Sequence, residues 1–285
     1  MPNPVLNDKA FAKAVARTPD QSGWASPSGT SHEVRREPDT AAPKWNPPVS
    51  DGPVTPWRSA NPMTASGAVS ATLLLMVVLI AAATVGWVQV PDSVPGEAAK
   101  FPAWTLIGMF VGLGCALLLT FKPTLARILA PAYAIATGVA VGAISKAYND
   151  AYSGIVLQAV GATLGVFVVM LVAYRSGIIR VTARFRRVVM GATLGVMLFY
   201  GVSLLLSLFG ADIFPQGSSL MSIGFSFLVA GIAAMNLALD FDFIEKAEAA
   251  GAPKYMEWYA AFGLLVTLVW LYLEILRLLS KLRDR

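Results

Sequence analysis

The sequence predicts an all-α membrane protein with seven transmembrane helices, and three observations support this fold class. Hydrophobic residues make up 56% of the 285 residues and charged residues only 14%, whereas a soluble domain usually has about 25% charged residues. The mean hydropathy is high, at +0.62. Seven apolar stretches follow one another between residues 67 and 282, and about 20 apolar residues are enough to cross a bilayer core as a helix.

A polar region precedes these stretches. Residues 1–62 are rich in Pro, Ser, Gly, Asp and Arg, and from residue 20 onward they have no sustained apolar period, so we expect disorder there. The first long apolar run starts near residue 67 and is too long for a signal peptide, so it is expected to be an uncleaved first helix. The predicted domains are a disordered tail, 1–62, and a transmembrane domain, 63–285.

Each transmembrane element is bounded by residues that end membrane helices. The expected spans cover residues 67–90, 103–121, 125–145, 152–174, 188–210, 218–240 and 262–282. The breaks between them contain Pro, Gly or charged residues. The break between the second and third spans is only Lys-Pro-Thr at residues 122–124, which predicts a tight hairpin.

The basic residues predict how the chain is oriented. The loop between the fourth and fifth spans has arginines at positions 175, 180, 184, 186 and 187. Loops enriched in Lys and Arg stay in the cytoplasm, so the amino terminus is expected inside and the carboxyl terminus, after seven spans, outside. The basic residues Arg277, Lys281, Arg283 and Arg285 favour the opposite side for the carboxyl terminus, and the sequence does not decide between the two.

Pairs of small residues one helical turn apart predict close helix packing. Gly108 and Gly112 form one such pair, and Gly138 and Gly142 another. The hexapeptide Gly-Ala-Thr-Leu-Gly-Val occurs at 161–166 and again at 191–196. Small residues let helix backbones approach in lipid, and we favour packing within one bundle over a dimer interface.

Several functional classes are excluded by composition. Cys115 and His32 are the only cysteine and histidine, so zinc sites, paired haem ligands and Cys-His nucleophiles lack their residues, and no cofactor is expected. The net charge of +5 comes from residues that flank the spans, which indicates contact with lipid headgroups rather than nucleic acid. An intramembrane aspartyl protease needs aspartates on two helices, whereas Asp240 and Asp242 share one. We therefore do not expect an enzyme.

Acidic residues interrupt the last two spans, and they are the candidate site. Asp240 and Asp242 lie at the end of the sixth span and Glu274 lies within the seventh. An ionised carboxylate inside a bilayer is costly and usually functional. Residues two apart point about 200° from each other on a helix, so Asp240 is expected to face the bundle. Asp242 and Glu245 then form either a mouth that attracts cations or a solvated helix end.

Two interpretations are open for Glu274. It can pair locally with Arg277, one turn away, or share a proton with Asp240 as a coupled carboxyl pair. Such a pair would sense pH, and after losing its proton it would favour Ca²⁺ between Asp240 and Glu274. A simple hairpin near Gly251 separates the two acids, since Asp240 then lies about 17 Å and Glu274 about 35 Å from the turn. They meet only if residues 251–259 run along the membrane surface.

Several strings resemble one protein family. They are Leu-Asp-Phe-Asp-Phe-Ile-Glu-Lys-Ala-Glu at 239–248, Trp-Leu-Tyr-Leu-Glu-Ile-Leu-Arg-Leu-Leu at 270–279, Tyr-Met-Glu-Trp-Tyr-Ala-Ala-Phe-Gly at 255–263, and the segments 130–145 and 152–160. Together they resemble the Bax inhibitor-1 family, also described as transmembrane BAX-inhibitor-motif proteins, and in particular its bacterial branch. The resemblance covers roughly residues 63–280.

The resemblance implies a fold and a function. It implies that the seventh helix is central and wrapped by six others, and that the protein is a pH-sensitive Ca²⁺ leak in a bacterial plasma membrane. The gate would be formed by Asp240 on the sixth helix and by Glu274, which lies where members of the family are expected to have an aspartate on the seventh helix. The loop between these acids is longer than in well-understood bacterial relatives. The second helix also lacks the arginine that holds the acid pair closed in those relatives. Arg127 is the nearest candidate for that latch.

Two functions are therefore expected from the sequence. The first is a Ca²⁺ leak that is gated by protonation of the two acids, with the lipid bilayer and calcium ions as its partners. The alternative is an interaction protein that modulates a membrane protease or another complex through residues 1–62.

Overall fold

The computed structural model describes residues 62–91, 103–210 and 219–285. Within these ranges seven helices are long and apolar enough to cross a membrane, as the sequence predicts. They are α2 (Ala65–Gln89), α3 (Ala103–Phe121), α4 (Ala126–Ala151), α5 (Ile155–Arg175), α6 (Ala183–Leu208), α7 (Leu220–Ala249) and α8 (Met256–Arg283), and the short 3-10 helix η2 (Pro123–Leu125) joins α3 to α4. Apart from Pro62, the predicted disordered tail lies outside the described residues.

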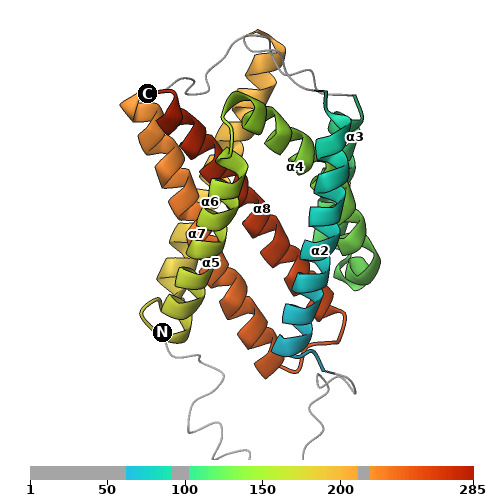
Figure 1. Cartoon of the computed structure of the whole chain (residues 1–285). Coiled ribbons are helices and arrows are strands. Elements are labelled where there is room, and N and C mark those ends of the chain that lie inside the picture. The colour runs from blue at the N-terminus through green and yellow to red at the C-terminus, as the bar shows by residue number, and fades with distance from the viewer. Residues whose placement is uncertain (1–61, 92–102, 211–218) are drawn as a thin grey trace, which may run out of the picture. The chain divides into compact units, whose positions relative to one another are not determined.

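Successive helices run in opposite directions (Figure 1). The start of α2 and the connections α3–α4, α5–α6 and α7–α8 lie at one end of the bundle, at the bottom of Figure 1. We call this the basic end, because the α5–α6 connection and the start of α6 carry Arg180, Arg184, Arg186 and Arg187. The last residues of α8 lie at the opposite end.

Helix α8 is the central element of the bundle. It packs against α2, α4, α5 and α7, and 56% of its apolar span is buried, compared with 11% for α6. Its core residues face two sides, since Leu265 joins an apolar cluster with Leu75 of α2, while Leu271 joins another with Ile155 of α5 and Leu237 of α7. The central position that the resemblance implied for the seventh helix is confirmed.

Several helices extend past the predicted spans. Helix α7 continues to Ala249, beyond the expected end at 240, and α8 begins at Met256, before the expected start at 262. Hydropathy marks only the apolar part of a helix, and these extensions contain charged residues, such as Asp242 in α7 and Glu257 in α8. As a result only residues 250–255 connect α7 to α8.

The small-residue pairs of α3 and α4 pack within the bundle as predicted. A Cβ atom added to Gly142 would lie 1.9 Å from the carbonyl oxygen of Ala83 on α2, and one on Gly108 would lie 2.9 Å from that of Ala136 on α4. Backbones therefore touch at these positions. The hexapeptide glycines do not share this packing, because a Cβ atom at 161, 165, 191 or 195 would meet nothing within 4 Å.

The carboxyl terminus is attached to the turn between α4 and α5. Arg283 donates hydrogen bonds to the carbonyl of Ser153, at 2.9 Å, and to Gln158. The phenol of Tyr152 donates to Asp284, and this bond raises the pKa of Tyr152 to about 12. The bonds of Tyr152 and Arg283 therefore hold the end of α8 to the α4–α5 turn.

Candidate functional site

Asp240 lies in α7 and faces α8. Its Oδ1 atom is 3.8 Å from the position that a Cβ on Gly263 would take, and the hydroxyl of Thr267, one turn further along α8, contacts its carboxyl group. Its Oδ2 atom is buried and has no hydrogen-bond partner among the described residues. An ionised carboxylate with an unbonded oxygen is costly in an apolar interface, which makes the charge state of Asp240 important for α7–α8 packing.

Glu274 forms a polar triangle with residues of α6 and α8. Its side chain is 1% exposed, and Oε1 accepts hydrogen bonds from the phenol of Tyr200 at 2.7 Å and from Nη1 of Arg277 at 2.8 Å. Arg277 also donates to the Tyr200 oxygen at 2.9 Å. The local pairing with Arg277 is therefore the correct interpretation of Glu274, and Tyr200 extends it to join α6 to α8.

The expected direct pair between Asp240 and Glu274 is not formed. Asp240 meets α8 at Gly263 and Thr267, and Glu274 follows Thr267 by seven residues, or about 10 Å along the helix. The cause is the short α7–α8 connection, because α8 enters the bundle at Met256 and residues 251–259 do not run along the surface. A Ca²⁺ site between the two acids therefore has no basis in this geometry, and no cluster of three or more ligand-type side chains occurs in the described ranges.

Arg127 does not occupy a latch position. It is exposed in the first turn of α4, and it makes no ion pair within the described residues. Among the described residues, buried acids are instead bound by Arg277, on the same helix as its partner Glu274, and by Arg186 of α6, which pairs with Asp242. A search for the latch in the second and third spans alone misses Arg277, because Arg277 lies in the seventh span.

The predicted acidic mouth is largely neutralised. Asp242 is 6% exposed, and it lies between Arg186 of α6, at 2.7 Å, and Lys246, at 2.7 Å. Glu245 is exposed, and its carboxylate accepts a hydrogen bond from the phenol of Tyr174 at 2.5 Å. Asp242 and Glu245 thus join α7 to α6 and α5.

Two cavities lie beside α8. One, of about 850 Å³, is near the basic end between α2, α5, α7 and α8, and charged residues from 175 to 248 form part of its wall. The other, of about 530 Å³, is lined by α2, α4, α5 and α8. Met76, Leu164 and Leu268 line both, so these three side chains form a boundary between two parts of one groove. We call the parts the charged half and the apolar half.

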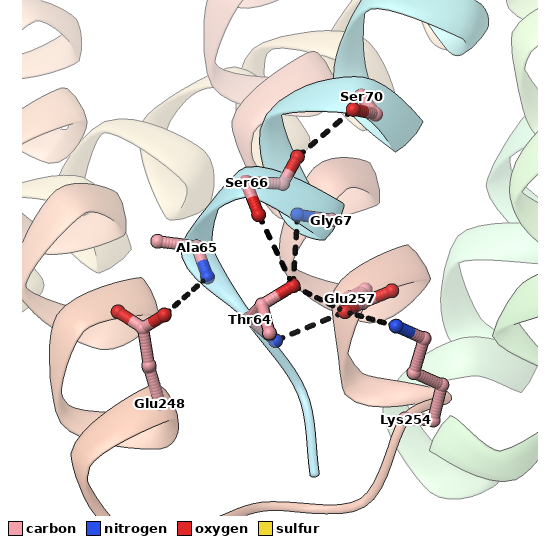
Figure 2. Close-up of polar contacts among 8 residues, drawn as sticks. All are labelled: Thr64, Ala65, Ser66, Gly67, Ser70, Glu248, Lys254 and Glu257. Carbon is pink, nitrogen blue, oxygen red and sulfur yellow. Dashed lines mark hydrogen bonds and ion pairs between the residues drawn. The ribbon is translucent and has the colours of Figure 1, made fainter. Parts of the chain in front are cut away.

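A set of acidic contacts at the start of α2 was not anticipated from the sequence (Figure 2). Glu257 is 5% exposed, and its Oε1 accepts hydrogen bonds from the backbone nitrogen of Thr64, at 2.9 Å, and from the Thr64 hydroxyl, at 3.0 Å. Lys254 pairs with the same oxygen at 3.0 Å, and Glu248 accepts from the backbone nitrogen of Ala65 at 2.8 Å. These contacts hold the first turn of α2 to the α7–α8 hairpin, and Thr64 itself caps α2 by accepting from Gly67.

Removing the Glu257 carboxylate is expected to weaken this attachment. Glu257→Ala leaves the half-buried Thr64 nitrogen without its carboxylate acceptor, which costs about 2 kcal/mol of unfolding free energy. Glu248→Ala removes a bond from the same helix start at an exposed position, so its cost is expected to be below about 1 kcal/mol. Thermal unfolding of both variants in detergent measures the difference, and equal losses would contradict the contribution assigned to the buried contact.

Comparison with known proteins gives one clear match. A family model described as Bax inhibitor 1 like matches residues 3–284, which is nearly the whole chain. No curated protein matches the chain.

Proposed function

Because the chain belongs to the Bax inhibitor 1 like family, we propose that it is a pH-sensitive calcium leak channel in which protonation of Asp240 controls conduction. It is an integral membrane protein, and its described residues include seven helices that are long enough to cross. The observation that carries the proposal is the Asp240 carboxyl group, which lies between two packed helices with one buried oxygen unbonded and which, unlike Glu274, has no ion pair within the described residues. We further propose that the membrane is a bacterial plasma membrane and that the basic end faces the cytoplasm, in line with the positive-inside rule.

The proposed control acts through the contact between α7 and α8. Protonated Asp240 is neutral and fits an apolar interface, whereas ionised Asp240 needs water or a cation at its free oxygen. Two residues next to this contact line the charged half of the groove: Phe241, which follows Asp240 in α7, and Leu268, which follows Thr267 in α8. Hydration of Asp240 therefore changes the packing of residues that form the wall of this cavity, and Leu268 is also part of the boundary to the apolar half.

Calcium fits the oxygen chemistry near the proposed path. Ca²⁺ binds carboxylate and carbonyl oxygens, and the charged half is lined by Glu245 and Glu248, two exposed acids that make no ion pair within the described residues. We assign Glu274 a different role from Asp240, because its charge is balanced by Arg277. In this proposal Glu274 holds α6 to α8, and no covalent chemistry or cofactor is involved.

Calcium flux into liposomes that contain the purified protein tests this function. We expect the full chain to pass Ca²⁺ above the level of protein-free liposomes, and a variant that lacks residues 1–60 to do the same. Flux from the full chain that equals the protein-free level would contradict the leak. Flux that is lost on truncation would favour the alternative, in which residues 1–62 act on a membrane protein partner.

A further inference from the structure

The apolar half of the groove offers few hydrogen-bonding groups. Four hydroxyl side chains line it, and each is already bonded: the hydroxyls of Thr84 and Thr163 donate to carbonyls of their own helices at 2.9 and 2.7 Å, and Ser145 and Tyr272 bond each other at 2.7 Å. Apart from the indole N–H of Trp87, the rest of the wall is hydrocarbon and aromatic. A space of about 530 Å³ with such a wall favours an apolar occupant.

The groove is open to the membrane between α2 and α5. These helices lie on either side of α8 (Figure 1), and side chains along the opening are exposed, with Leu73 at 62%, Ile80 at 58% and Leu164 at 48%. All three line one half of the groove or both. Lipid chains therefore reach the groove directly from the bilayer.

The charged half has cations without acidic partners. Its three acids are engaged, because Asp242 is paired with two basic residues, Glu245 accepts from Tyr174, and Glu248 accepts from the start of α2. Arg175 and Arg180 also line this half, and neither makes an ion pair within the described ranges. Within the part of the chain that the structure describes, the Arg180 side chain donates one hydrogen bond, to the nearby carbonyl of Gly177 at 3.4 Å. Guanidinium groups bind phosphate in two-point geometry, so these arginines select an anionic headgroup.

The length of the charged half matches one leaflet. Arg175 and Leu164 are eleven residues apart on α5, or about 17 Å, and one leaflet contributes about 15 Å of hydrocarbon. A headgroup at Arg175 would therefore lie at the membrane surface, and its acyl chain would reach the boundary residues near the bilayer centre.

From these observations we propose that the groove binds one anionic phospholipid of the leaflet at the basic end. Its phosphate lies at Arg175 and Arg180, and one acyl chain lies between α2 and α5 against α8, and passes Leu164 toward the apolar half. The inference goes beyond calcium conduction and does not depend on it, because binding is measured without any flux.

Native mass spectrometry of the full chain in detergent, with added dioleoyl phosphatidylglycerol, tests the headgroup. We expect Arg175→Gln with Arg180→Gln to lower the retained lipid about tenfold or more. Arg184→Gln with Arg187→Gln removes the same charge from exposed positions outside the groove, so retention should stay at the wild-type level. Equal losses in the two double variants would overturn the site, as would equal retention of zwitterionic dioleoyl phosphatidylcholine by the wild type.

A second pair of variants tests the acyl chain. Leu164→Trp fills the boundary between the two halves and is expected to lower retention of the lipid, whereas Val169→Trp, at a position that is 65% exposed and lines neither cavity, should not. Added inorganic phosphate is expected to displace little lipid, since it lacks the chain. Unchanged retention in Leu164→Trp, or full displacement by phosphate, would overturn the placement of the chain.

Discussion

Replacing Glu274 with leucine is expected to lower the unfolding free energy by about 3 kcal/mol. The change leaves the partly buried Arg277 without its carboxylate and removes the acceptor for the Tyr200 phenol. Breaking one side of a buried ion pair is costly because the remaining charge stays out of water. For a protein of this size the loss corresponds to a fall of roughly 6 to 12 °C in the unfolding temperature in detergent.

The double variant Glu274→Leu with Arg277→Leu separates lost charge balance from lost packing. Replacing both members of a buried pair with apolar residues is often nearly neutral, so the double variant should recover most of the stability. An unfolding temperature in the double variant below that of Glu274→Leu would contradict the view that the loss of the carboxylate beside Arg277 is the cause. So would an unchanged temperature in Glu274→Leu.

Gly142→Val is expected to have the next largest effect on stability. The added Cβ would lie 1.9 Å from the carbonyl oxygen of Ala83, which belongs to backbone and cannot rotate away. Helices α2 and α4 must separate to admit it, and overpacking of this kind costs about 3 kcal/mol. Gly165→Val is the matched control, since nothing lies within 4 Å of its Cβ position. Similar unfolding temperatures for the two variants would show that α2 and α4 do not pack as closely as the structure indicates.

The helix count was predictable because a bilayer imposes one length on every span. Charged extensions such as the end of α7 were missed, because they lie outside the apolar core that hydropathy detects. Helix geometry predicted that a simple hairpin separates Asp240 from Glu274, whereas the resemblance implied that the two acids act as a pair. The simple hairpin is the one that forms, so helix geometry was the better guide.

Other features depend on contacts that no local pattern encodes. Thr64 is a recognisable helix cap, but its acceptor Glu257 is 193 residues away in the sequence. The two-part groove is formed by side chains from α2, α4, α5, α7 and α8, and its location depends on how these helices cross. The pairing of Arg277 with Glu274 was readable from their spacing, whereas the third member of the triangle, Tyr200, was not.

The pH dependence of calcium flux in Asp240→Asn tests the central claim most directly. Asparagine keeps the size of aspartate and is neutral at every pH, so it imitates the protonated state. We expect wild-type flux to change across the neutral pH range as Asp240 changes its protonation state, and Asp240→Asn to keep throughout the flux that the wild type shows at the acidic end of that range. Asp242→Asn, the same change two residues away in an ion-paired position, should keep the wild-type dependence. A wild-type pH profile in Asp240→Asn would contradict the assignment of Asp240 as the controlling group.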